Sequence, residues 1–163
     1  MRIILDGMGG DNAPAAVVEG AVIASKDIEH EIVIIGQEEL IQNELNKYRY
    51  NPKKISVVNA REVITNEEAP VRAVRSKKDS SIVRGINMVK NGEGDIFISA
   101  GSTGALLSGG LFILGRIQGI DRPALASVYP IVGGTPSLLV DAGANAECKP
   151  NNLLEFGIMG NIY

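Results

Sequence analysis

The stretch that decides the fold is DIFISAGSTGALLSGGLFIL, residues 95–114. Its first residues, 95–98, form an apolar run that predicts a strand, and the apolar residues of 103–114 predict a helix. Between them lie small and hydroxyl-bearing residues, which add little to a core and leave backbone N–H groups bare. A strand that enters a helix through such a turn indicates an α/β protein.

The same alternation of strand and helix runs along the chain. Apolar runs predict further strands at 2–5, 31–35, 54–58, 124–131 and 137–140. Helical signals predict helices over 14–27, 37–48, 70–77 and 80–90. The strands are continuously apolar rather than alternating, as in a sheet covered on both faces. We therefore expect an α/β fold with a largely parallel sheet and helices on both faces.

Length and composition indicate one α/β domain spanning residues 1–163. With 16 basic against 19 acidic residues the net charge is −3, which gives no reason to expect a nucleic-acid partner. Cys148 is the single cysteine, so an internal disulfide is excluded, and the N-terminus lacks a signal-peptide core. We expect a cytoplasmic protein. Because residues 151–163 read as an apolar helix start without a polar tail, we expect the N-terminal portion of a longer chain.

The glycine-rich loop at 99–104 is the first candidate site. Ligands of open α/β sheets bind where strands end and helices begin. Gly101 and Gly104 permit close backbone approach, and Ser102 or Thr103 can cap the following helix. The free N–H groups of such a helix start favour an anion, typically phosphate. The alternative is an ordinary capped helix, and neither G-x-x-x-x-G-K-[ST] nor G-x-G-x-x-G occurs in the chain.

Two further loops follow predicted strands. In DGMGGDNAP, residues 6–14, the acids Asp6 and Asp11 either orient a substrate or cap a turn. In DAGANAECKP, residues 141–150, Asn145 can donate to a carbonyl oxygen or phosphate, and Lys149 can pair with an anion. The alternative for this loop is a plain connection with a surface lysine.

A basic segment occupies residues 69–79, where Arg72, Arg75 and Lys78 fall on one arc of a predicted helix. It is a docking patch for an acidic partner, a phosphate clamp or simply a solvated surface. Cys148 has no histidine partner, because His30 precedes a strand at its amino end. We therefore expect a structural thiol rather than a nucleophile. No cluster has metal-ligand spacing, so no metal site is expected.

Four stretches taken together resemble the bacterial phosphate acyltransferases of phospholipid synthesis. They are DGMGGDNAP (6–14), EAPVRAVRSKKDSS (68–81), SAGSTGALLSGGLFILGRIQGIDRPALA (99–126) and LLVDAGANAECKPNNLLEFGIMG (138–160). The resemblance spans essentially the whole chain. The family pattern usually has Ala where Gly7 stands and Asn where Ser102 stands, and both positions keep a small or polar residue.

The resemblance implies transfer of a fatty-acyl group from an acyl carrier protein thioester to inorganic phosphate, giving acyl phosphate, without a cofactor. It also implies a fold similar to phosphotransacetylases and isopropylmalate dehydrogenases, a homodimer, and a cytoplasmic protein able to associate with the membrane periphery. The alternatives are a phosphotransacetylase acting on acyl-CoA and a non-catalytic module that binds phosphate or acyl groups.

We assign roles to residues of these motifs by their positions, in three groups. The phosphate and substrate group comprises Ser99, Gly101, Ser102, Thr103, Gly104, Asp6, Asp11 and Asn12. The last three orient the glycine-rich loop or the pantetheine arm of the carrier. The catalytic group comprises Asn145 and Lys149. The residues expected to dock the carrier are Arg72, Arg75, Lys77 and Lys78.

Overall fold

The structure is a computed structural model and describes residues 1–162. The chain divides into two compact units, one from Met1 to Leu114 and one from Gly115 onward. The expectation of a single domain spanning the chain stays a prediction.

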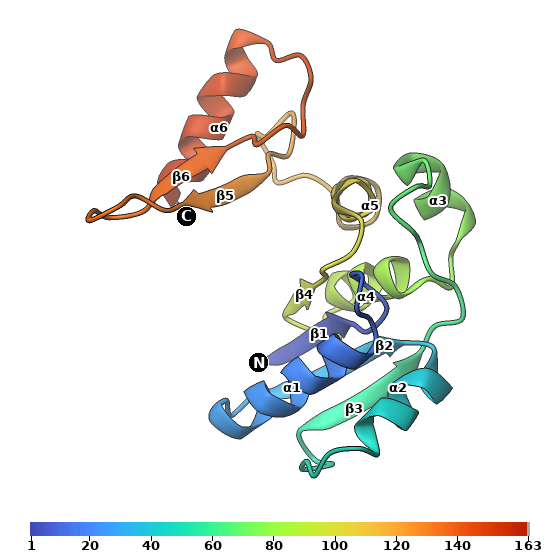
Figure 1. The fold of residues 1–163 in the computed structure, drawn as a ribbon. Coiled ribbons are helices and arrows are strands. Elements are labelled where there is room, and N and C mark those ends of the chain that lie inside the picture. The colour runs from blue at the N-terminus through green and yellow to red at the C-terminus, as the bar shows by residue number, and fades with distance from the viewer. Residues whose placement is uncertain (163) are drawn as a thin grey trace. The chain divides into compact units, whose positions relative to one another are not determined.

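The first unit is built on a parallel sheet (Figure 1). Its four strands are β1 (Arg2–Asp6), β2 (Glu31–Gly36), β3 (Ile55–Asn59) and β4 (Ile96–Ile98). They lie in the order β3-β2-β1-β4, and each neighbouring pair is parallel. The predicted α/β fold with a largely parallel sheet is confirmed. The order places the ends of β1 and β4 side by side, because Leu5 pairs with Ile98.

Helices cover both faces of this sheet (Figure 1). On one face lie α1 (Ala15–Asp27) and α2 (Glu38–Leu45); on the other lies α4 (Ser81–Lys90). Successive residues of a strand point to opposite faces. In β2, Ile32 and Ile34 therefore pack with α1 and α2, whereas Val33 and Ile35 belong to the core that includes residues of α4. The continuous apolar run of β2 follows from this double burial.

A third cluster joins α3 (Pro70–Ser76), α4 and α5 (Thr103–Gly109). Val74, Ile82 and Ala105 are fully or almost fully buried in it. The α-helix predicted over 103–114 ends at Gly109, and the chain continues as the π-helical turn η1 (Gly110–Leu114). Two consecutive glycines stand at this junction, and glycine has a weak preference for the α-helix.

The second unit contains β5 (Ala126–Tyr129), β6 (Ser137–Val140) and α6 (Pro150–Ile162). The two strands form an antiparallel hairpin in which Ala126 pairs with Val140. Helix α6 packs on β6 through Gly160, where an added Cβ would lie 2.7 Å from Val140 Cγ2. Among residues 1–162 no helix has the length and apolar character needed to cross a membrane.

Candidate functional site

Two loops meet at the carboxyl ends of β1 and β4, and Asp6 holds them together. Ser99 Oγ donates to Asp6 Oδ2 over 2.7 Å, and the backbone N–H of Met8 donates to Asp6 Oδ1 over 3.0 Å. The Ser99 hydroxyl in turn accepts from the Gly101 N–H over 3.0 Å. Only 1% of Asp6 is exposed. The buried carboxylate thus fixes the start of both the 6–14 loop and the 99–104 loop.

Gly9 and Gly101 are in close backbone contact between these loops. A Cβ added to Gly9 would lie 2.7 Å from Asp6 Oδ2 and 2.8 Å from the Gly101 nitrogen. A Cβ added to Gly101 would lie 3.2 Å from the Gly9 Cα atom. No side chain fits at Gly9 without a shift, so the sequence needs glycine here for close approach.

The start of α5 supplies the donors that an anion would meet. Ser102 caps the helix, since its side chain accepts from the Ala105 N–H over 3.3 Å. The Gly101 N–H is already bound to Ser99. Within residues 1–162, the N–H groups at the helix start with no protein partner are therefore those of Ser102, Thr103 and Gly104. The hydrogen bonds around Asp6 hold the backbone that presents them.

A cavity of about 190 Å³ opens beside Gly101. One wall is the 8–11 part of the first loop, including Asp11. The opposite wall is the segment 63–67, which follows β3 and which the sequence did not single out as part of a site. Its residues Thr65, Asn66 and Glu67 are polar and exposed, and this polarity at a strand end was the signal available in the sequence. Asn12, predicted beside Asp11, is exposed and lies outside this lining.

Lys77 secures the 63–68 segment. Its Nζ donates to the Val63 carbonyl over 2.6 Å and forms an ion pair with Glu68 at 2.7 Å. Hydrogen bonds from Lys77 and from the backbone N–H of Thr65 lower the pKa of Glu68 below its ordinary value of 4.5. A hydrogen bond with the Thr65 side chain lowers the pKa of Glu67 in the same way. Both carboxylates are therefore ionised at neutral pH. Lys77, expected on the docking surface, is instead engaged with this segment.

The other three predicted docking residues are exposed around α3. Arg72 lines a hollow of about 360 Å³ together with Glu68. The Arg75 guanidinium carbon lies 5.1 Å from the centroid of the Phe112 ring, a cation–π geometry. Lys78 Nζ donates to the Val74 carbonyl over 3.3 Å. Arg72 and Lys78 are thus the charges least committed to packing.

Comparison with known proteins assigns the family. The model of the fatty acid synthesis protein family matches residues 1–163. The chain belongs to this family. A phosphate acyltransferase from Alkaliphilus oremlandii is 60% identical over 163 residues, and one from Clostridioides difficile is 53% identical. Both alignments cover 100% of this chain and 48% of the relative, so the chain spans about half the length of these curated relatives. The resemblance to phosphate acyltransferases is confirmed.

A solved structure gives the likeness of fold. The crystal structure of a phosphotransacetylase from Streptococcus pyogenes superposes with a TM-score of 0.69. The superposition covers 97% of this chain and 51% of the phosphotransacetylase chain. At 24% identity the match shows the fold alone, and it confirms the expected similarity of this chain's fold to that of phosphotransacetylases.

In this member of the fatty acid synthesis protein family, Asn145 and Lys149 belong to the second unit. The Asn145 Nδ2 group donates to the Pro123 carbonyl and to Asp141 Oδ1, each over 3.1 Å, so its amide holds the 141–150 loop together. Lys149 is exposed. Their catalytic role stays a prediction.

Cys148 is exposed in the same loop, with Sγ 4.0 Å from Asp141 Oδ2. His30 lies directly before β2, at the amino end of that strand, as expected. Among residues 1–162 no group of three or more His, Cys, Asp or Glu side chains is arranged to hold a metal ion.

Proposed function

We propose that the protein transfers a fatty-acyl group from an acyl carrier protein thioester to inorganic phosphate, releasing acyl phosphate for phospholipid synthesis. The observation that carries the proposal is the 60% identity, across every residue of this chain, to a protein named phosphate acyltransferase. The Asp6–Ser99–Gly101 arrangement supports it, because it holds N–H donors at the carboxyl end of a parallel sheet.

The reaction needs no covalent bond between the protein and the acyl group. A phosphate oxygen attacks the thioester carbonyl carbon, a tetrahedral oxyanion forms, and the carbon–sulfur bond breaks. The carrier leaves as a thiolate, which takes up a proton from solvent. Because phosphate is a nucleophile at neutral pH and thiolate is a fair leaving group, no acyl-enzyme is needed. The protein must align the reactants and stabilise developing negative charge.

The residues around Gly101 suit this task. The N–H groups of Ser102, Thr103 and Gly104 are placed to bind phosphate or the oxyanion, with the positive end of the α5 backbone behind them. Asp6 acts through Ser99 as a positioning residue. Asn145 and Lys149 are proposed to complete the site from the 141–150 loop. Arg72, Arg75 and Lys78 form the proposed docking surface for the acidic carrier, and we place the protein in the cytoplasm as a homodimer that can reach the membrane periphery.

The test is mass spectrometry of the products. The full-length protein is mixed with inorganic phosphate and either an acyl carrier thioester or the matching acyl-CoA. The proposal expects acyl phosphate and free carrier from the first mixture, with much less product from the second. Efficient product from acyl-CoA alone would assign a phosphotransacetylase, and no product from either would leave a binding module.

A further inference from the structure

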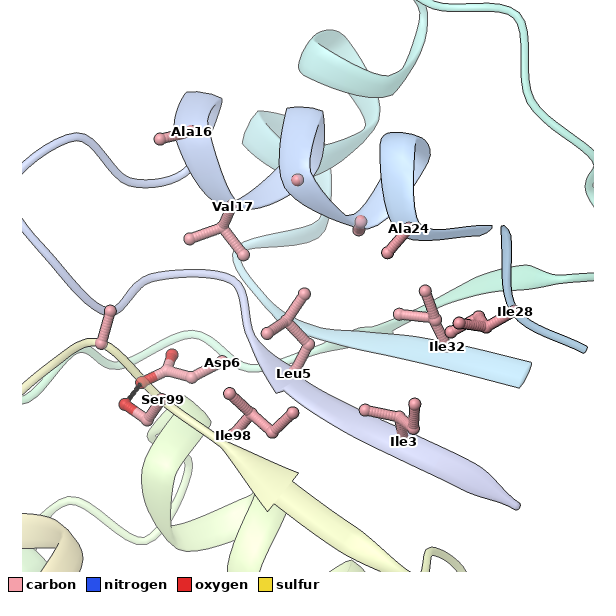
Figure 2. Close-up of a pocket in the computed structure, with 13 residues that line it drawn as sticks. Ile3, Leu5, Asp6, Ala16, Val17, Ala24, Ile28, Ile32, Ile98 and Ser99 are labelled. Carbon is pink, nitrogen blue, oxygen red and sulfur yellow. Dashed lines mark hydrogen bonds between the residues drawn. The ribbon is translucent and has the colours of Figure 1, made fainter. Parts of the chain in front are cut away.

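A further cavity in the first unit, of about 330 Å³, lies between α1 and the sheet (Figure 2). Figure 2 shows Val17 and Ala24 of α1 on one side and Leu5 and Ile98 of the sheet on the other. The volume falls in the range of small-molecule sites. The cavity is open rather than sealed, since 46% of Ile98 is exposed.

The walls of this cavity are hydrocarbon almost throughout. The polar side chains among its lining residues are Asp6 and Ser99, which lie at one end and bind each other (Figure 2). Because these two side chains are hydrogen-bonded to each other, neither is free to bind a polar group of a molecule in the groove. An occupant stabilised here must itself be apolar, because a polar group would lose its hydrogen bonds to water.

The groove is continuous with the proposed phosphate site. Ser99 and Ala100 line its end, and the next residue is Gly101, whose N–H donates to Ser99 Oγ. At the other end lie Ile28 and Ile32. The distance along α1 from Ala16 to Ile28 is roughly 18 Å at 1.5 Å per residue. A long chain lying in the groove would thus reach the reacting loop with one end.

We propose that this groove binds the hydrocarbon tail of the acyl substrate, with the thioester carbonyl at Ser99–Gly101 and the methyl end toward Ile28. The inference rests on the proposed acyl transfer. Gly20 is the residue that leaves room for the tail. It lines the groove from the middle of α1, and a Cβ added there would meet no atom within 4 Å. Each methylene buried is worth about fourfold in affinity.

The test substitutes Gly20→Leu in the full-length protein. The new side chain fills the groove part-way along, so long tails lose contact whereas short tails still fit. We expect kcat/KM for a hexadecanoyl carrier thioester to fall by at least about tenfold relative to a butanoyl thioester, with the melting temperature unchanged or slightly raised. The matched control is Ala15→Leu, because Ala15 is an exposed residue of α1 outside the groove lining.

A second measurement locates the acyl tail on the protein directly. A carrier thioester whose acyl tail ends in a diazirine is photolysed on the protein, and labelled peptides are mapped by mass spectrometry. Labels on α1 or β1, lost in Gly20→Leu, support the groove. Labels elsewhere, or an unchanged ratio of long-chain to short-chain turnover in Gly20→Leu, overturn it.

If the groove holds something other than the acyl tail, the two measurements give different results. A lower melting temperature with an unchanged chain-length ratio would mean that a polypeptide segment fills the groove, and the proposal would be wrong. Absence of acyl phosphate at every chain length would instead refute the proposed reaction, and photolabelling of α1 would then still decide whether the groove binds a tail.

Discussion

Ser99 Oγ donates to Asp6 Oδ2 over 2.7 Å and so links the ends of two adjacent strands from positions 93 residues apart in the chain. The same hydroxyl accepts from the Gly101 N–H. The position of the glycine-rich loop therefore depends on a buried carboxylate that is distant in sequence. Loss of this link should affect folding and phosphate binding together.

Ser99→Ala is expected to lower both stability and phosphate affinity. Asp6 Oδ2 would lose its donor while remaining buried, at a cost of about 1–3 kcal/mol in the free energy of unfolding. The Gly101 N–H would also lose its acceptor, so the loop would be held less firmly. Urea denaturation and phosphate saturation curves measure the two effects. Ser99→Thr keeps the hydroxyl and is the control. Unchanged stability and unchanged KM for phosphate in Ser99→Ala would contradict the role given to this pair.

Gly9→Ala should disturb the same loops from the other side. The added methyl would lie 2.7 Å from Asp6 Oδ2 and 2.8 Å from the Gly101 nitrogen, closer than such atoms pack. We expect a lower melting temperature and at least a tenfold loss of turnover, because misplacement of reacting groups is costly. Gly157→Ala is the control, since a Cβ there meets no atom within 4 Å and alanine favours the helix. Full activity in Gly9→Ala would show that the loops can separate without harm.

The sheet was predictable because each strand carries its own signal. Four apolar residues in a row at 32–35 require burial on both faces, and the structure supplies α1 and α2 on one side and α4 on the other. The loop at 99–104 was predictable as a site for the same local reason. It joins a strand to a helix and carries glycine at positions 101 and 104.

The features of the site that the sequence did not predict depend on contacts between residues distant in the chain. Segment 63–67 reaches the cavity beside Gly101 because Lys77 binds Val63 and Glu68, and no local pattern announces that pair. Likewise, the sequence predicted bare N–H groups in the loop before the helix, but the Gly101 N–H donates to the hydroxyl of Ser99. A hydroxyl two residues away can either bind the backbone or face a ligand, and only the position of Asp6 decides between them.

The ion pair between Lys77 and Glu68 predicts a pH-dependent contribution to stability. The Lys77 hydrogen bond, followed by that of the Thr65 N–H, lowers the pKa of Glu68 in the folded state below 4.5. A lowered pKa means that the stabilisation is complete above the unfolded value and is lost as the pH falls through the folded value. Glu68→Gln should therefore lower the melting temperature modestly at pH 7 and hardly at all in strong acid. A difference in melting temperature that is the same at both ends of the pH range would contradict the assignment.

Cys148→Ala is expected to keep most of the activity. The thiol is exposed and has no histidine near it in sequence, and acyl transfer to phosphate needs no protein nucleophile. Intact-mass measurement during turnover should detect no acyl-enzyme, while a thiol reagent should label the exposed cysteine readily. A loss of roughly a thousandfold, the size expected on removal of a catalytic group, would make Cys148 the nucleophile.

Reversal of charge at Arg72 and Lys78 should weaken recognition of the carrier. Both side chains are exposed, whereas Lys77 is bound to Glu68 and Arg75 packs on Phe112. Exposed charge pairs contribute up to about 1 kcal/mol each. Loss of both contributions would cost up to about 2 kcal/mol, so Arg72→Glu with Lys78→Glu is expected to raise KM for the acyl carrier thioester by up to about thirtyfold. It should also flatten the dependence of that KM on salt. KM for phosphate should not change.

The control for this double variant is Lys53→Glu with Lys90→Glu. It changes the net charge equally but reverses exposed lysines that precede β3 and β4, at the amino end of the sheet and away from the loop of Gly101. Steering by overall charge would make the two double variants behave alike. A local docking surface requires that only the α3 variant lose affinity for the carrier. If phosphate affinity collapses in the α3 variant while carrier affinity holds, Arg72 and Lys78 belong to the anion site and the carrier docks elsewhere.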